Sequence, residues 1–124
     1  MGIDVYLKWP GQSEAEQKAQ YTGFSIVSGD VGYLREAYHG EPYATHVLLP
    51  ECFGDGNPEQ KIAAITLIER LPDAIRACIA RHRKVYREEI GPDDPPCKAY
   101  ADFVRLAAEK EAATGEPCTV YASY

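Results

Sequence analysis

The segment from position 32 to position 46, GYLREAYHGEPYATH, holds the densest group of chemically versatile side chains in the sequence. It contains three tyrosines, two histidines, one arginine and two glutamates around a Gly-Glu-Pro turn. Histidine titrates near neutral pH and tyrosine offers an aromatic face with a hydroxyl group, so together they suit recognition of a small polar or anionic group. The segment therefore predicts a ligand- or partner-binding set made of Tyr33, Arg35, Tyr38, His39, Tyr43 and His46.

These side chains need elements to position them, and the spacing predicts a helix followed by a strand. Residues 31–39 are expected to be helical, which would place Arg35 and His39 one turn apart so that both can face one ligand. Tyr38 would then point inward. Residues 44–49 are expected to form a strand. A solvated polar surface without a pocket is the other interpretation of the same pattern.

A small acid–base enzyme is the alternative function for this segment. In that hypothesis His39 or His46 moves a proton, a tyrosine hydroxyl from Tyr38 or Tyr43 assists, and an arginine holds an anionic substrate. The arginine would be Arg35. The hypothesis requires these side chains to converge on one concave site, which the sequence alone does not establish.

More specific chemistry finds little support in the sequence. A zinc site built from His39, His46 and Cys52 matches no compact ligand spacing, so we expect no metal and no cofactor. No phosphate-binding loop, dinucleotide motif or GxSxG elbow is present. Neither a catalytic nor a metal-ligating residue is therefore assigned.

A second candidate surface is basic and lies on a predicted helix that starts at Pro72. Arg83 and Arg87 lie seven and eleven positions after Arg76. This spacing returns all three to nearly the same side of a helix. Guanidinium groups match carboxylate and phosphate geometry, so this face could dock an acidic partner or an anionic ligand. The alternative is a solvated face that pairs with Glu88, Glu89 and other acids.

Composition excludes several classes of protein. The 124 residues carry a formal charge of -6, so a nucleic-acid backbone would meet net repulsion. No apolar run is long enough to span a bilayer and no secretory signal is visible, so we expect an acidic, soluble, cytoplasmic protein. The four cysteines are scattered without a CxxC pair and are expected to be free, buried thiols.

The remaining pattern predicts an α+β fold in a single globular domain, residues 1–124. Residues 3–9 and 118–124 alternate apolar and polar side chains, so both chain ends are expected to be strands of one small sheet. Three or four helices should pack mainly on one face of it. They are expected over residues 13–20, from Asn57 to about Leu71, from Pro72 to about position 90, and over residues 96–114.

Among these possibilities, the sequence favours a non-catalytic binding or protein-interaction domain of otherwise unknown function. A chain this short has limited volume for a deep pocket as well as a core, which slightly favours a protein partner over a small polar ligand. A homodimer formed through an apolar helix face or a sheet edge is a further expectation.

Overall fold

The structure is a computed structural model that describes residues 2–21, 29–54 and 57–124. Within these described residues, four strands, four α-helices and three short helical turns follow one another along the chain. In order they are β1 Gly2–Lys8, α1 Glu14–Tyr21, η1 Gly29–Val31, β2 Tyr33–Ala37, α2 Ala44–Leu48, η2 Pro50–Cys52, β3 Glu59–Lys61, α3 Ala64–Arg81, η3 His82–Tyr86, α4 Pro95–Thr114 and β4 Thr119–Ser123.

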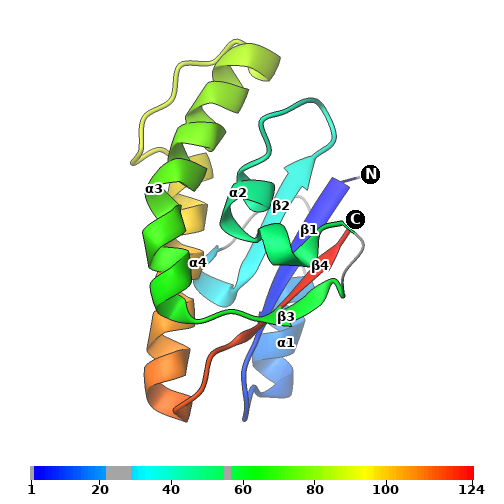
Figure 1. Cartoon of the computed structure of the whole chain (residues 1–124), viewed down its shortest axis with the longest axis vertical. Helices are drawn as coiled ribbons and strands as arrows, with labels where there is room; N and C mark the ends of the chain where they lie inside the picture. The colour runs from blue at the N-terminus through cyan, green and yellow to red at the C-terminus, as the bar shows by residue number, and fades with distance from the viewer. Residues whose placement is uncertain (1, 22–28, 55–56) are drawn as a thin grey trace.

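The four strands form one antiparallel sheet in the order β2-β1-β4-β3. The terminal strands β1 and β4 are therefore neighbours at its centre, with Asp4 opposite Ser123 and Leu7 opposite Val120. Figure 1 shows the start of β1 and the end of β4 side by side. The predicted α+β fold, with both terminal strands in one small sheet, is confirmed.

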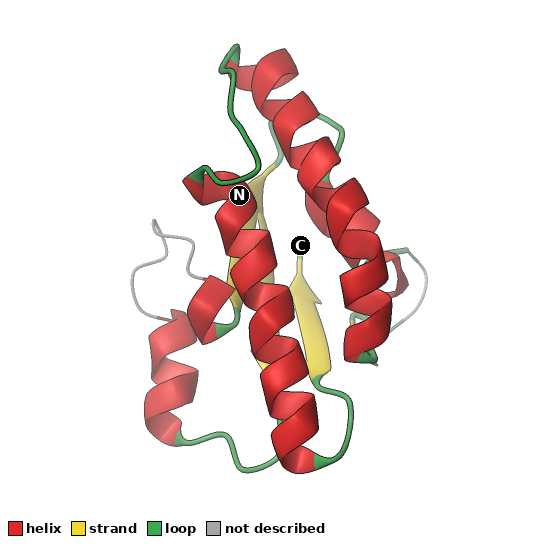
Figure 2. Ribbon diagram, turned by 90° about the vertical axis from the view of Figure 1, so that its left-hand side faces the viewer, coloured by secondary structure: helices red, strands yellow, loops and turns green. Residues whose placement is uncertain are grey.

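The two faces of the sheet follow the alternation of the sequence. Ile3, Val5 and Leu7 are fully buried on the face that carries the core, where they meet Phe103 of α4 and other apolar side chains. Asp4 and its alternate neighbours lie on the opposite face. Figure 2 shows the two long helices in front of the strands, so the helices cover mainly the apolar face.

Side chains at both ends of helix α1 fix its start and its attachment to the sheet. Ser13 Oγ accepts from the backbone N–H of Glu16 at 3.1 Å, and a Glu16 carboxylate oxygen accepts from the N–H of Ser13 at 2.9 Å. This is the capping box that the Ser-x-x-Glu spacing predicts, and it is confirmed. Gln20, 1% exposed, donates to the carbonyls of Leu7 and Val31, which ties the helix to the sheet.

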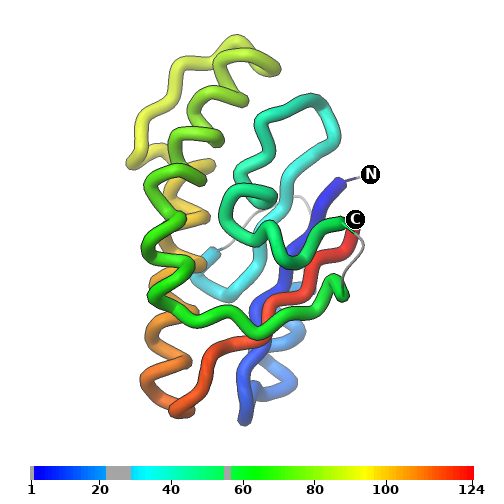
Figure 3. The backbone as a smooth tube through the Cα atoms, in the orientation of Figure 1, coloured from blue at the N-terminus to red at the C-terminus, as the bar shows by residue number. Residues whose placement is uncertain are grey.

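The two expectations for residues 31–49 are wrong. Residues 33–37 form strand β2 rather than a helix, because their backbone groups pair with β1 along the whole length of the strand. Residues 44–48 form helix α2 rather than a strand, because the carboxylate of Glu36 accepts from the N–H groups of Ala44 and Thr45. Figure 3 traces the chain as it reverses between β2 and α2. The first error comes from pairing with the distant strand β1, and the second from hydrogen bonds that a side chain of β2 makes after the chain has reversed.

The second half of the chain is predicted more closely. The expected helix start at Asn57 is wrong, because residues 59–61 pair with β4 and the helix begins only at Ala64. From there α3 runs to Arg81 as one helix with Pro72 inside it, instead of ending and restarting. Helix α4 and its end at Gly115, which has a φ of 80°, are confirmed.

Three further observations concern the other expectations. All four cysteines are buried and free, as predicted. Among the helices that the structure describes, none is long and apolar enough to cross a membrane. The sequence also predicts a short strand at residues 24–27, and this segment lies outside the described residues.

Candidate functional site

A pocket of about 460 Å³ opens between strand β2, the end of α3 and the start of α4. We call it the Arg81 pocket. It is lined by Arg35, Glu36 and Ala37 of β2, by Cys78, Arg81, His82 and Tyr86 of α3 and η3, by Glu88, and by Pro95, Pro96 and Tyr100 of α4. Three segments that are distant in sequence thus contribute to one concave site.

Glu36 forms part of the polar floor of the Arg81 pocket and also organises helix α2. It lies on the core face of β2 and is 5% exposed. One carboxylate oxygen accepts from the N–H of Ala44 at 2.9 Å, and the other accepts from the N–H and hydroxyl of Thr45 at 3.1 and 2.6 Å. These bonds satisfy N–H groups at the first turn of a helix, where a negative charge is favoured.

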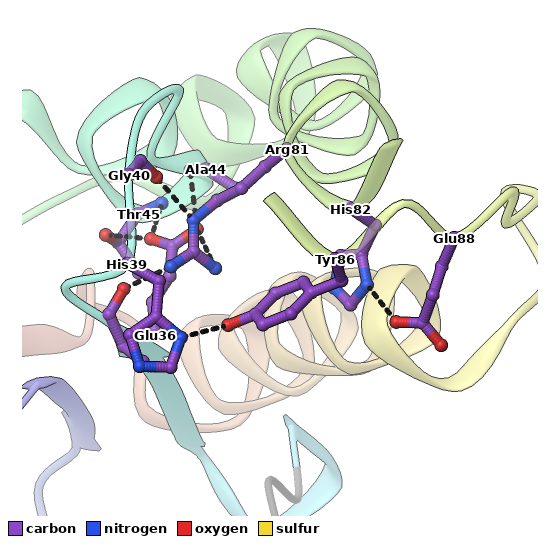
Figure 4. A network of polar contacts seen from close by, with 10 residues as sticks. Glu36, His39, Gly40, Ala44, Thr45, Arg81, His82, Tyr86 and Glu88 are labelled. Carbon is purple, nitrogen blue, oxygen red and sulfur yellow. Dashed lines mark hydrogen bonds and ion pairs between the residues drawn. The ribbon is translucent and has the colours of Figure 1, made fainter. Parts of the chain in front are cut away.

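Arg81 is the only arginine among the buried polar residues in the described part of the chain, with 4% of its surface exposed. Its guanidinium donates to the carbonyls of Gly40, at 2.8 Å, and Ala37. The same group lies over the rings of Tyr43 and Tyr86, 5.4 and 5.7 Å from their centroids. Figure 4 shows Arg81 reaching from the helix to the β2–α2 connection, which it holds against α3.

Arg81 and Glu36 form a buried ion pair of opposite charges. Nη1 of Arg81 lies 3.9 Å from an oxygen of Glu36, which is within ion-pair range but too long for a hydrogen bond. Nη1 makes no hydrogen bond within the described residues. Every fully buried side-chain nitrogen or oxygen among the described residues has a hydrogen-bond partner. Nη1 has none, so it retains some exposure to solvent. Arg81 lines the pocket, and Nη1 is its guanidinium nitrogen without a hydrogen-bond partner among the described residues.

The buried wall of the pocket holds a phenol and a thiol that stay protonated. Burial, reinforced by the charge of Glu36, raises the pKa of Tyr100 well above its ordinary value. Burial likewise raises the pKa of Cys78, and the neighbouring Cys97 thiol adds to the effect. Both groups are therefore neutral at physiological pH, and neither is activated as a base or a nucleophile.

The rim of the pocket is formed by a row of aromatic and ionisable side chains. Nδ1 of His82 lies 3.3 Å from an oxygen of Glu88, and the His82 ring lies 5.0 Å from that of Tyr86. The Tyr86 hydroxyl is in turn 3.0 Å from Nδ1 of His39. Figure 4 shows Tyr86 pointing from η3 toward His39, so the rim spans from α3 to the β2–α2 connection.

The predicted residues of β2 lie mainly on the opposite face of the sheet. Tyr33 is 1% exposed and donates its hydroxyl to Asp4 at 2.5 Å, while Arg35 donates to the same carboxylate at 2.9 Å. Burial, followed by the hydrogen bond to Asp4, raises the pKa of Tyr33 to about 12. Arg35 borders the Arg81 pocket but commits its guanidinium to Asp4, whereas His39 contacts Tyr86.

The other predicted residues of this segment belong to an aromatic row outside the pocket. The rings of Tyr38 and Tyr43 lie 6.1 Å apart, and Tyr43 and His46 lie 5.0 Å apart. The row continues from His46 to Phe53 at 4.1 Å and on to Tyr124. Tyr38 is 44% exposed, so the expectation that it points inward is wrong. None of Tyr38, Tyr43 and His46 lines the Arg81 pocket.

The predicted basic face is partly neutralised by acids of the same chain. Arg83 donates two hydrogen bonds of 2.9 Å to Glu89, and Arg76 pairs with Asp73. Arg87 forms no ion pair within the described residues and adopts a left-handed backbone at the end of η3. The alternative interpretation, in which this face pairs with neighbouring acids, fits two of the three arginines.

The central residues of the pocket were missed or misplaced by sequence reasoning. Arg81 continues the buried series Ala74, Cys78 along α3, and a charged residue on such a stripe is a usable signal of a buried ion pair. The pattern of the helix predicted over residues 96–114 indicates Tyr100 only as a core residue. Nothing local in the sequence connects either of them with Glu36, because the three lie on separate elements.

No group of three or more His, Cys, Asp or Glu side chains in the described residues is arranged to hold a metal ion. Comparison of the chain with protein-family models, with curated proteins and with solved structures finds no match. The assignment of a function therefore depends on the geometry of the Arg81 pocket.

Proposed function

We propose that this chain is a non-catalytic binding protein that holds a small polar ligand in the Arg81 pocket. The observation that carries the proposal is a concave site of about 460 Å³ with a buried Arg81–Glu36 pair on its floor. Small-molecule sites have volumes of about 300–1,000 Å³ and apolar walls with a few placed polar groups. The pocket has both properties, so it favours a small ligand over the protein partner expected from chain length.

Binding without catalysis is supported by how the ionisable groups are engaged. A general base needs a lone pair that can reach a substrate proton. Both oxygens of Glu36 already accept hydrogen bonds from α2, and His82 faces Glu88. The acid–base alternative gains no support, since of its named residues only Arg35 lines the pocket.

We also propose that the protein is soluble and resides in the cytoplasm. Its four cysteines are all free and buried. A reducing compartment such as the cytoplasm maintains free thiols. The formal charge of -6 favours solubility. Protein binding and homodimer formation remain predictions, for which sedimentation at several concentrations is the direct measurement.

The proposal is tested by screening small polar compounds against the full chain by ¹H–¹⁵N correlation NMR. A ligand of the Arg81 pocket should shift the amide signals of Cys78, His82 and Tyr86 together. Cys78→Leu adds volume to the pocket wall and should abolish these shifts. Ala112→Leu, which fills an exposed hollow between α3 and α4, is the matched control and should leave them unchanged. Binding that survives Cys78→Leu, or shifts that never reach these residues, would contradict the proposal.

A further inference from the structure

The two arginines that line the Arg81 pocket are each paired with a carboxylate. Arg81 faces Glu36, and Arg35 is bonded to Asp4. Glu88 at the rim keeps much of its hydration, because 60% of its side chain is exposed. An ion that enters a partly buried site loses hydration, and it is stabilised there only if the site offers an uncompensated opposite charge. Each of the two arginines already has a carboxylate, so a charged ligand would have little to offset that loss.

The floor of the pocket nevertheless offers hydrogen-bond donors. Nη1 of Arg81 makes no hydrogen bond to any described residue, and a guanidinium can donate but cannot accept. A ligand group that meets it must therefore be an acceptor. Because Glu36 already balances the charge, a neutral carbonyl oxygen satisfies the donor without adding a second negative charge beside that carboxylate.

The walls of the pocket determine the shape of the rest of the ligand. Tyr86 and Tyr100 contribute aromatic rings, and Pro95 and Pro96 contribute flat aliphatic ones. Rings of this kind favour stacked or edge-on contact with another planar group. The walls therefore favour a planar aromatic body.

From these observations we infer that the ligand of the Arg81 pocket is an uncharged aromatic or heteroaromatic compound that carries a carbonyl or amide group. The carbonyl accepts from Nη1 of Arg81, and the ring lies between Tyr86 and the Pro95–Pro96 wall. This inference rests on the proposed function and specifies the chemical class of the ligand.

Three fragments of nearly equal size separate charge from shape. Benzamide is neutral near pH 7, benzoate is an anion and benzylamine is a cation, so they share one ring and differ in charge. Each is titrated into the full wild-type chain and followed through the amide signals of Cys78, His82 and Tyr86. We expect benzamide to bind at least about tenfold more tightly than either charged fragment, and to shift the guanidinium resonance of Arg81.

The outcomes distinguish this inference from the proposal on which it rests. Tighter binding of benzoate or benzylamine would overturn the neutral-ligand inference while leaving a functional pocket. If none of the three fragments shifts the pocket signals at concentrations up to about 10 mM, both the inference and the proposed function fail. Benzamide shifts that persist in Cys78→Leu but vanish in Ala112→Leu would place binding at another site and overturn the inference as well.

Discussion

At the scale of single residues, the most consequential pair is Glu36 with Arg81. Each is about 95% buried, since their exposed fractions are 5% and 4%. Burial of charge is costly unless every group is paired and hydrogen-bonded. Here Glu36 accepts three hydrogen bonds from α2, and Arg81 donates to the carbonyls of Ala37, at the end of β2, and Gly40, in the β2–α2 connection. One ion pair therefore links the edge strand, helix α2 and helix α3.

Replacing Arg81 by methionine should be strongly destabilising. The change leaves the Glu36 charge buried without its counter-ion and removes the donors that hold the β2–α2 connection. Loss of one partner of a buried ion pair typically costs about 3–5 kcal/mol, so Arg81→Met should lower the free energy of unfolding by about that amount. The free energy is measured by urea denaturation followed by circular dichroism.

Arg76→Met is the matched control for that measurement. Arg76 also lies on α3 and forms an ion pair, but 70% of its side chain is exposed. An exposed pair contributes between about 0 and 1 kcal/mol, so this variant should unfold close to the wild-type midpoint. Equal effects of the two substitutions would mean that the buried pair has no special role.

At the scale of elements, the C-terminal ends of the two long helices α3 and α4 share one backbone feature, and the end of α3 borders the pocket. Helix α3 passes into the π-helical turn η3, and the chain then reverses at Arg87, which has a φ of 55°. Helix α4 ends at Gly115, where φ is 80°. The first end positions His82 and Tyr86 at the rim. Both ends use left-handed backbone, but only the second has a glycine.

Substitutions at these two ends should have opposite effects on stability. A left-handed conformation costs a residue with a side chain about 1–2 kcal/mol, and glycine avoids this cost. Arg87→Gly should therefore raise the free energy of unfolding by up to about 1 kcal/mol, after its greater unfolded-state entropy is included. Gly115→Ala should lower it by about 1 kcal/mol. Thermal unfolding of both variants is the measurement, and a loss of stability in Arg87→Gly would contradict the prediction.

At the scale of the whole molecule, several acidic groups are buried in their neutral forms. Burial raises the pKa of Cys52 and of Cys118 from 9.0 to about 11, and that of Tyr33 from 10.0 to about 12. In the unfolded chain these groups ionise at their ordinary pKa values. Their protonated forms therefore contribute to the free energy of unfolding, and this stabilisation is complete only below about pH 9.

Stability should consequently fall as the pH rises from 9 toward 11. At pH 10 the unfolded chain gains about 1 kcal/mol from ionisation of each of the two thiols, whereas the folded chain keeps most of them protonated. Urea midpoints measured between pH 8 and pH 10.5 should therefore decrease steadily. Cys52→Ala should start from a lower stability and lose less over the same range. A flat profile would show that the thiols ionise alike in both states.

The sequence by itself determined those features that depend on local patterns. Alternation in residues 3–7 specified a half-buried strand, Ser13 with Glu16 specified the start of α1, and Gly115 specified the end of α4. These signals work because a capping bond or a strand face involves residues that are close together in the chain. They were sufficient for the α+β class and for placing both terminal strands in one sheet, whereas the order of the strands came from the structure.

Only the tertiary structure decided the secondary structure of residues 33–48 and which residues form the site. Residues 33–37 become a strand because β1 supplies their hydrogen-bond partners, and α2 becomes a helix because Glu36 satisfies its first N–H groups. Arg81 and Tyr100 join Glu36 from two other elements. Arg81 and Tyr100 lie more than forty positions from Glu36, so no local spacing connects them with it, and the three meet only when the helices pack on the sheet.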